Sequence, residues 1–389
     1  MNRSEDRRRL LLVAPEPFYE DRGTPITIRY VLEAAGELGY ETDVVTFALG
    51  SSLDIRGTRY FRTFNPLGFQ SIPIGLSSKK VFFDVLLTRL LQERLANERY
   101  FCIHAVQEAA FPAILLAHGH GVPVCYDMQS SLPEQLALTH GFRSRPIQAV
   151  LRRLERWLLC NADTVICMPA LTAEMQAAAP GTRFREWNYP AAAENLVVAG
   201  ADTDALRDEL RIRRRASVVL YTGTFEPYQG LPSLLEGFPE VLAAIPDAVL
   251  VVVGATSEPR TDYGANVRIL NRQPRERMPV FLNLADVLVC PRAHGKNLPL
   301  KILDYMAVGK PIVATDIVAH RAVLDHDRAL LVEPSSHELA DGIVRLLQDS
   351  DLAGRLGAAA MTYCNENLSW PGFVNFLSEV YETTGTRDS

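Results

Sequence analysis

The sequence lacks several features that would point to specialised classes of protein. Its six cysteines are scattered and form no Cys-x-x-Cys pair, which argues against a disulfide framework or a zinc site. No apolar run approaches the roughly 18 residues needed to cross a membrane, and the charged segment Met1–Arg9 does not resemble a signal peptide. The net charge of −6 gives no basic surface for nucleic acid. We therefore expect a reduced, cytoplasmic protein with no nucleic-acid partner.

Apolar residues divide the chain into two blocks of alternating strands and helices. A length of 389 residues and an apolar fraction of 48% suit two domains that each bury a core. Continuous apolar runs between amphipathic helices indicate parallel sheets covered on both faces. We predict an α/β protein with two Rossmann-like domains, residues 1–195 and 196–370, and a C-terminal segment, residues 371–389. We place the linker near Tyr189–Asp204. The predicted strands are Leu10–Ala14, Thr42–Phe47, Cys102–Val106, Val122–Met128, Asp163–Met168, Ser217–Tyr221, Ala248–Val253, Val267–Leu270, Asp286–Cys290, Ile312–Thr315 and Ala329–Val332.

The segment Pro291–Asp316 is the most informative part of the chain. It follows a predicted strand with a polar loop, and Pro299 then suits the first position of a short helix. Such an arrangement holds anions, because the first helical N–H groups are unsatisfied and the helix dipole favours negative charge there. Lys296 and Lys301 add positive charge, and Asp304 lies one turn along on the face of Lys301. The pattern predicts a site for a phosphate-bearing ligand with hydroxyl groups.

This segment resembles the donor-site signature of the GT-B glycosyltransferases, family 4. Asp304–Pro311 matches the second half of that signature, and Asp304 stands where a Glu holds the nucleotide ribose. Lys296 replaces the first Glu of the signature, and Arg292 replaces a Ser, as in a sub-branch that reads Pro-Arg-x-x-Gly-x-Asn-x-Pro-x-Lys. The resemblance extends over most of the chain. It implies two Rossmann-like domains facing a cleft, a last helix that crosses back onto the N-terminal domain, retention of anomeric configuration and no metal or cofactor.

The resemblance also implies a set of donor-binding residues. In the family, an Arg and a Lys in the first loop of the second domain grip the donor diphosphate, and here these positions are Thr224 and Gln229. Neutral side chains can donate hydrogen bonds but lack charge, so we expect Lys301 and Arg292 to supply the positive charge. The alternative is an ordinary strand-to-helix turn. The implied donor-binding residues are Gly223, Thr224, Gln229, Gly230, Arg292, Asn297, Leu298, Lys301 and Asp304.

The first block contains the candidates for acceptor binding. Ala14–Pro25 is a long loop at the carboxyl edge of a sheet, and it lacks the Gly-x-Gly-x-x-Gly of a dinucleotide site. The resemblance implies acceptor contacts at Gly23 and Thr24 in this loop. Gln129 stands where the family often has His, and it can bind a sugar hydroxyl but cannot act as acid or base. Glu108 ends another strand and is either functional or a solvated carboxylate. The candidates for catalysis are Lys301, Arg292, Gln129 and Glu108, with no catalytic base assigned.

Neither the histidines nor the acidic triplets predict a metal site. His104 lies in an apolar strand, and His118 and His120 mark a helix end, so core or capping roles are favoured. The Asp-x-Asp triplets Asp202–Asp204 and Asp325–Asp327 lie in polar turns, where we expect surface roles.

The segment His140–Cys160 predicts a helix whose five Arg residues separate from its apolar residues. Such a helix either packs on the core with a solvated basic face, which we favour, or lies on anionic lipid at the inner face of a membrane.

Taken with the resemblance, these features predict a glycosyltransferase that moves a sugar from a nucleotide-sugar donor to a glycan, lipid-linked or small-molecule acceptor. One alternative is a subunit that binds a nucleotide-sugar without transferring it, which the neutral Thr224 and Gln229 would suit. The other is an epimerase or a phosphorylase-like enzyme on the same fold.

Overall fold

The structure is a computed structural model, and it describes residues 8–20, 23–73, 77–137, 142–187, 189–191, 199–255 and 263–385. The chain forms two compact units. Unit 1 comprises Met1–Tyr189 together with Pro371–Ser389, and unit 2 comprises Pro190–Trp370. Part of the predicted linker lies outside the described residues. The prediction is wrong for residues from Gly200 onward, because they form a helix, Gly200–Glu209.

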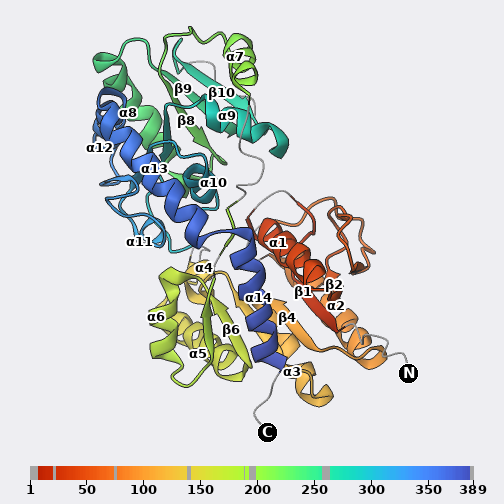
Figure 1. Cartoon of the computed structure of the whole chain (residues 1–389). Helices are drawn as coiled ribbons and strands as arrows, with labels where there is room; N and C mark the ends of the chain where they lie inside the picture. Colours follow the sequence, from red (N-terminus) through yellow and green to blue (C-terminus); the bar gives the residue numbers. More distant parts are fainter. Residues whose placement is uncertain are drawn as a thin grey trace. The chain divides into compact units, whose positions relative to one another are not determined.

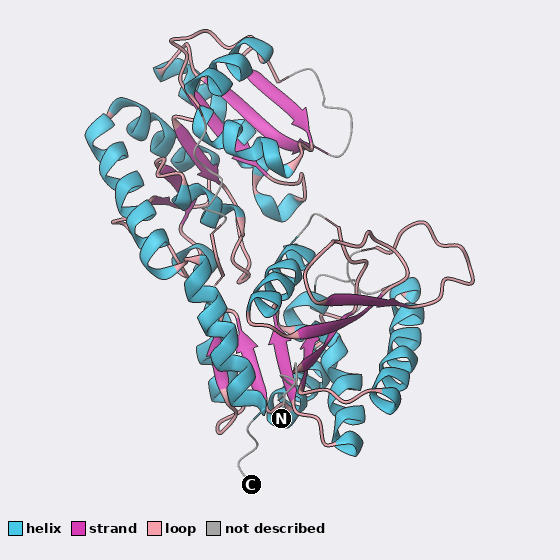
Figure 2. Ribbon diagram, turned by 45° about the vertical axis from the view of Figure 1, so that its right-hand side comes forward, coloured by secondary structure: helices cyan, strands magenta, loops and turns pink. Residues whose placement is uncertain are grey.

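Unit 1 is built on a seven-stranded sheet in the order β3-β2-β1-β4-β5-β6-β7, with every neighbouring pair parallel. Helices cover the sheet on both faces (Figure 2). Its strands are β1 Arg9–Ala14, β2 Glu41–Thr46, β3 Thr58–Arg62, β4 Cys102–Val106, β5 Val124–Met128, β6 Thr164–Cys167 and β7 Phe184–Glu186. Its helices are α1 Gly23–Glu37, α2 Ser78–Asn97, α3 Ala110–His120, α4 Leu132–Ala137, α5 Arg145–Asn161, α6 Pro169–Ala178 and α14 Trp370–Gly385.

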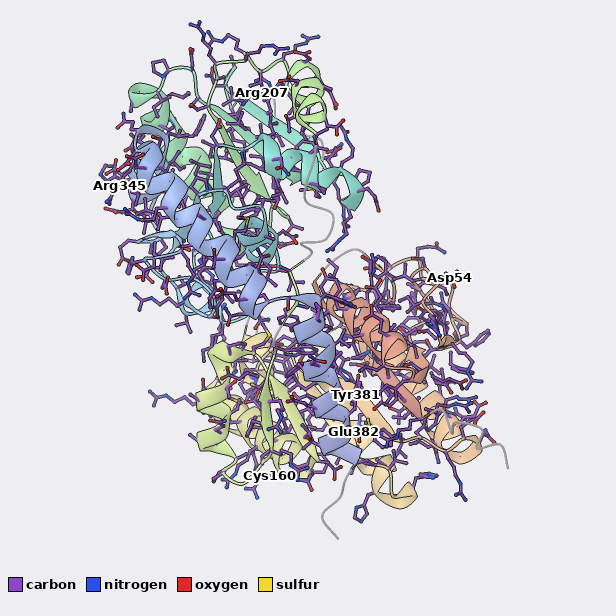
Figure 3. All side chains as sticks on the ribbon, in the orientation of Figure 1. Asp54, Cys160, Arg207, Arg345, Tyr381 and Glu382 are labelled. Atoms are coloured by element: carbon purple, nitrogen blue, oxygen red, sulfur yellow. The ribbon has the colours of Figure 1, made fainter. Side chains whose placement is uncertain are left out.

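The last helix, α14, packs within unit 1 although it is distant in sequence (Figure 1). The hydroxyl of Tyr381 lies 3.2 Å from Nδ1 of His104 on β4, and Phe373 stacks on Trp187 with ring centroids 6.0 Å apart. The adjacent Glu382 pairs with Arg8 at the surface (Figure 3). Burying two large aromatic rings supplies several kcal/mol, at about 25 cal/mol per Å² of apolar surface. This apolar contact fixes α14 to the first sheet.

Unit 2 is built on a six-stranded parallel sheet in the order β10-β9-β8-β11-β12-β13. Its strands are β8 Val218–Thr222, β9 Val249–Ala255, β10 Val267–Asn271, β11 Val287–Cys290, β12 Ile312–Thr315 and β13 Leu330–Val332. Its helices are α7 Gly200–Glu209, α8 Leu231–Ala244, α9 Met278–Leu284, α10 Lys301–Ala307, α11 Val318–Arg321, α12 Ser336–Gln348 and α13 Ser350–Asn367. The prediction of two parallel-sheet α/β domains is therefore confirmed.

Each sheet has one point at which the strand order reverses direction. In unit 1 the reversal lies between β1 and β4, and in unit 2 it lies between β8 and β11. The loops that leave the carboxyl ends of two such strands diverge to opposite faces of the sheet, which opens a crevice between them. Ligands of open α/β sheets bind in this crevice, so the loops after β8 and β11, and those after β1 and β4, are the places to look for a site.

Candidate functional site

In unit 2, the loops after β8 and β11 approach each other closely. Gly230 lies in the left-handed region, with φ +74°, and a Cβ at this position would overlap the carbonyl oxygen of Pro291. Only glycine allows the two backbones to lie so close together. The sequence predicts Gly230 as a donor-binding residue, and the structure gives it this packing role. The close approach brings Gly223, Thr224 and Gln229 to the same edge of the sheet as Arg292 and its loop.

The ammonium group of Lys301 is buried at this edge. Its Nζ makes no hydrogen bond to any part of the chain that the structure describes, and it lies 4.3 Å from the ring centroid of Tyr221. A Cβ on Gly223 would come within 2.7 Å of it, so the absence of a side chain there makes room for the cation. Burial lowers the pKa of Lys301, Cys290 opposes the fall and Arg292 adds to it, and together they bring the pKa to about 8. A buried cation without an acceptor is costly, and an anion at this edge would relieve that cost.

Arg292 supplies a second cation, held by its own loop. Its Nη1 donates to the carbonyl of Asn297 at 2.8 Å, and its Nε donates to the carbonyl of His294 at 3.2 Å. The guanidinium carbon lies 5.1 Å from the ring centroid of Tyr228, which belongs to the loop after β8. Burial lowers the pKa of Arg292, yet a guanidinium stays charged at any working pH. Arg292 therefore braces the loop that carries Asn297 and places positive charge beside Lys301.

The other predicted residues of these two loops, Thr224, Gln229 and Leu298, differ in how far their side chains are exposed to solvent. The side chain of Thr224 is exposed, and its carbonyl oxygen accepts a hydrogen bond of 2.8 Å from the Tyr221 hydroxyl. Oε1 of Gln229 is buried and has no hydrogen-bond partner among the described residues. Leu298 is only 8% exposed, so a ligand would meet its backbone rather than its side chain.

The start of α10 differs from the sequence prediction. The helix begins at Lys301, after Pro299. The N–H groups of Ile302 and Leu303 donate to the carbonyls of Pro299 and Leu300, at 2.9 and 3.0 Å. Two of the N–H groups that we expected to face an anion are therefore already bonded, and the charge at this edge comes mainly from side chains.

Asp304 lies one turn into α10 and is partly exposed. Lys301 shares its helix face at i,i+3, but Nζ of Lys301 makes no hydrogen bond to it.

Cys290 and His320 form a buried pair behind the cations, which the sequence analysis missed. Sγ of Cys290, at the end of β11, lies 3.4 Å from Nε2 of His320 on α11. Nδ1 of His320 lies 2.7 Å from the carbonyl oxygen of Thr315, which can only accept, so Nδ1 carries a proton. Both side chains are fully buried. Thirty positions separate the two residues, and the signal that would have found them is that β11 and β12 are neighbours, which places the ends of both strands together.

In unit 1, the predicted acceptor residues are joined by a chain of hydrogen bonds. Nε2 of Gln129 donates to the hydroxyl of Thr27 at 2.8 Å, and that hydroxyl donates to the carbonyl of Thr24 at 2.8 Å. Nε2 of Gln129 also donates to the buried carboxylate of Asp127 at 2.8 Å. Both amide hydrogens of Gln129 are then used, and its carbonyl is the group left for a ligand. Gly23 begins α1, and an added Cβ there would meet no atom within 4 Å.

The switch point of unit 1 carries a cluster of charged groups. Lys80 pairs with Glu108, in the turn that follows β4, and donates to the carbonyl of Pro15 at 2.6 Å, just after β1. Lys80 thus ties together the two loops between which the strand order reverses. Burial raises the pKa of the nearby Asp84 to about 7, with Lys80 opposing the rise and Glu108 adding to it. Glu108 is therefore an ion-paired residue of the switch point rather than a solvated carboxylate.

The described residues contain neither a metal-binding cluster nor a membrane-spanning helix. No group of three or more His, Cys, Asp or Glu side chains there has the arrangement to hold a metal ion. Among the same residues, no helix combines the length and apolar character required to cross a bilayer. His104 is buried against Tyr381, as a core residue.

Two family models match the chain. Residues 22–183 match the glycosyl transferase 4-like domain, and residues 216–349 match the glycosyl transferases group 1. A curated relative, the phosphatidyl-myo-inositol mannosyltransferase of Mycobacterium leprae, is 28% identical over 218 residues, which are 53% of this chain and 58% of that protein. The chain thus spans little more than half the length of this curated relative.

Solved structures share the fold over nearly the whole chain. Sucrose-phosphate synthase from Thermosynechococcus elongatus aligns with a TM-score of 0.80 at 20% identity, covering 97% of this chain and 98% of that one. HepE from Anabaena, in complex with UDP, aligns with a TM-score of 0.73 at 18% identity, covering 97% of this chain and 100% of that one. Each of the two parallel-sheet units thus matches a glycosyltransferase domain, and the chain belongs to the GT-B glycosyltransferases, family 4.

Proposed function

We propose that the protein transfers a sugar from a nucleotide-sugar to an acceptor, and that unit 2 binds the donor. The observation that carries the proposal is the buried ammonium of Lys301, which has no hydrogen-bond acceptor in the described part of the chain and lies at the β8–β11 switch point. A diphosphate bound at this edge would meet Lys301 and Arg292. The complexes of HepE with UDP and with UDP-glucose support a nucleotide diphosphate as the ligand class.

The proposed chemistry uses the two cations to stabilise the leaving group. As the bond between the sugar and the diphosphate breaks, negative charge grows on the diphosphate. Fixed positive groups in a site shielded from water stabilise that charge without reorganisation, which lowers the barrier. Lys301 and Arg292 take this role, with hydrogen bonds from Gly223, Thr224 and Gln229. Retention of configuration follows from the family resemblance, and no protein base is assigned.

The nucleoside part of the donor is assigned to the loop after β11 and to α10. Asp304 accepts hydrogen bonds from the ribose hydroxyls, because its carboxylate is partly exposed and lies one turn into α10 beside the loop after β11. Asn297 and the backbone of Leu298 belong to the same loop, after β11, and would contact the nucleoside. Such hydrogen bonds to a charged group contribute roughly 1.5–3 kcal/mol each.

The acceptor is assigned to unit 1, near Gly23, Thr24 and Gln129. The carbonyl of Gln129 would accept a hydrogen bond from an acceptor hydroxyl, and the exposed backbone of Gly23 leaves room for close approach. Relatives named as phosphatidyl-myo-inositol mannosyltransferase and D-inositol 3-phosphate glycosyltransferase suggest a polyol or a polyol-bearing lipid as the acceptor class. We propose GDP-mannose and phosphatidylinositol as the first pair to test.

The exposed residues of helix α5 are evidence for a peripheral contact between this protein and a membrane. We prefer a helix whose apolar residues pack on the core, and Leu151 and Leu158 do so, whereas Val150 and Leu154 are exposed. Ile147, Val150 and Leu154 are 37%, 59% and 41% exposed, at helical spacing. The exposed Arg152 and Arg153 lie between them in the sequence. An exposed apolar stripe with flanking arginines suits the surface of an anionic bilayer. A double variant, Val150→Ser with Leu154→Ser, should lose sedimentation with phosphatidylglycerol vesicles, and unchanged sedimentation would refute the contact.

The proposed transfer is tested by binding and by turnover. A thermal-shift screen of UDP-, GDP- and ADP-sugars should find one class that stabilises the protein, by about 2.7 kcal/mol at 100 times its Kd. Incubation of that donor with phosphatidylinositol or inositol phosphate should then yield a glycosylated product. Binding without any transfer across a panel of glycan, lipid and small-molecule acceptors would contradict the proposal and favour a binding subunit.

A further inference from the structure

The orientation of the Gln129 side chain is fixed by the groups behind it. Its Nε2 lies 2.8 Å from Oδ2 of Asp127 and 2.8 Å from the hydroxyl oxygen of Thr27. A carboxylate can only accept hydrogen bonds, and the Thr27 hydroxyl uses its proton on the carbonyl of Thr24. The group that faces both oxygens must therefore be the NH2 group, because a turned amide would set Oε1 against the carboxylate. Oε1 is then the atom of the amide that takes no part in these bonds.

Asp127 is itself held by the indole of Trp187. Nε1 of Trp187 donates to Oδ1 of Asp127 at 2.8 Å, and the two residues are buried, with Asp127 only 1% exposed. An indole N–H can only donate, so it keeps Oδ1 turned toward itself and Oδ2 toward Gln129. Each oxygen of the carboxylate thus has a fixed N–H donor, and the Gln129 amide has one stable orientation.

The C-terminal helix α14 supports Asp127 by two routes. Phe373 stacks on Trp187 with ring centroids 6.0 Å apart. The hydroxyl of Tyr381 lies 3.2 Å from Nδ1 of His104, and Nε2 of that ring lies 3.5 Å from Oδ2 of Asp127. All of these side chains are buried and belong to unit 1. The helix that returns to the first unit therefore packs against the groups that hold this carboxylate.

We propose that Asp127 and Trp187 are positioning residues of the acceptor site, which keep the carbonyl of Gln129 turned toward the acceptor. A carbonyl accepts but cannot donate, so this subsite selects a hydroxyl group of a polyol or sugar and disfavours a phosphate or carboxylate oxygen. An amide turned around would present its N–H groups and have the opposite preference. This inference rests on the proposed function, because it takes Gln129 as a residue that contacts the acceptor.

The variant Asp127→Asn tests the orientation without any substrate. The indole of Trp187 can only donate, so it takes the carbonyl oxygen of the new side chain, and the new NH2 group then faces Gln129. The Gln129 amide should turn, and its own NH2 group should leave the buried bonds. Hydrogen exchange of this NH2 group, followed by NMR and assigned through Gln129→Met, measures the change. In the unsubstituted protein it should exchange far more slowly than that of the exposed Gln92, and Asp127→Asn should abolish the difference.

A kinetic test separates positioning from general support of the fold. Trp187→Phe keeps an aromatic ring for the stack with Phe373 but removes the N–H donor to Asp127. With GDP-mannose and phosphatidylinositol as substrates, this variant should raise the KM for the lipid by roughly tenfold, because an oriented hydrogen bond is lost, and leave the KM for GDP-mannose unchanged. The matched control is Tyr189→Phe, at a ring that stacks on Trp187 with centroids 4.7 Å apart, and it should change neither value.

Each outcome decides a different claim. Fast exchange of the Gln129 NH2 group in the unsubstituted protein would overturn the proposed orientation, and so would unchanged exchange in a folded Asp127→Asn variant. If that variant does not fold, the exchange in Trp187→Phe takes its place and should be faster than in the unsubstituted protein. Equal changes in the two KM values, or an equal effect of Tyr189→Phe, would refute a positioning role. Absence of transfer by the unsubstituted protein would contradict the proposed substrates, and the exchange measurement would still confirm or overturn the orientation.

Discussion

Replacement of Lys301 by Met should make the protein more stable and less active at the same time. Methionine is similar in length but carries no charge, so it removes the buried ammonium and keeps the apolar contact with Tyr221. Burial lowers the pKa of Lys301 from 10.5 to about 8. At about 1.4 kcal/mol for each pKa unit, this fall corresponds to about 3 kcal/mol of lost stability at pH 7. We therefore expect the variant to gain up to about 3 kcal/mol in its free energy of unfolding.

The pH dependence of this gain in stability distinguishes the removal of a buried charge from an improvement in packing. Below about pH 8, Lys301 is charged in both the folded and the unfolded states, and the full cost applies. Between about 8 and 10.5 the folded state loses its proton first, so the unfolded state binds more protons and the stability of the unsubstituted protein rises with pH. The gain from Lys301→Met should thus shrink over this window. Urea denaturation at about pH 7 and about pH 9.5 measures both values.

The same variant should lose turnover. Lys301 acts where charge grows in the transition state, so kcat should fall by on the order of a hundredfold, and nucleoside binding should change less. Lys310→Met is the matched control, because Lys310 precedes β12 and lies at the opposite edge of the sheet. The reasoning is refuted if Lys301→Met lowers stability at pH 7, if its gain does not depend on pH, or if only KM changes.

Three further predictions follow from the same structure. Asp304→Ala should weaken nucleotide binding by roughly 1.5–3 kcal/mol in calorimetry with little change in unfolding, and unchanged affinity would remove Asp304 from the ribose site. Gly230→Ala should destabilise the protein by more than about 1 kcal/mol in denaturant, because its φ is +74° and its Cβ would overlap the carbonyl of Pro291. The control Gly354→Ala, in α13 with no atom within 4 Å of an added Cβ, should be neutral or stabilising. Transfer should persist in EDTA, because side-chain cations neutralise the diphosphate, and a chelator-sensitive activity restored by Mg²⁺ would contradict that account.

Most of the sheet framework is predictable from the sequence, and its exceptions have simple causes. Runs such as Leu10–Ala14 are buried on both faces of a parallel sheet, so they read as continuous apolar segments. The edge strand Thr58–Arg62 was missed, because its sequence Thr-Arg-Tyr-Phe-Arg has neither an apolar run nor an alternating pattern, and none of its residues is fully buried. Helix α2 was missed as well. Its buried residues Phe83, Leu87, Leu91 and Leu95 recur every fourth position, but exposed apolar residues such as Val81 and Val85 obscure this helical period.

The site is predictable only in part, because its residues come from several elements. The sequence identifies the loops after β8 and β11 through a local motif, and strand order then places both at one edge. It does not indicate that the Lys301 ammonium is buried. That burial depends on Gly223 leaving space and on the ring of Tyr221, both some eighty positions earlier in the chain. A surface lysine and a buried one look alike in a local motif, so the property that carries the function appears only when the fold is assembled.

The buried cation also explains why the two neutral substitutions in the loop after β8 do not leave the site without charge. Thr224 and Gln229 stand where the family resemblance places an Arg and a Lys, and exposed cations there would be screened by water and salt. Lys301 and Arg292 are both largely withdrawn from solvent, and a cation in such surroundings acts on a nearby phosphate with less screening. Holding Lys301 charged lowers the stability of the fold, and the charge stabilises the site only when an anion is bound beside it. A residue whose removal should stabilise the protein is therefore the one that we expect the reaction to need most.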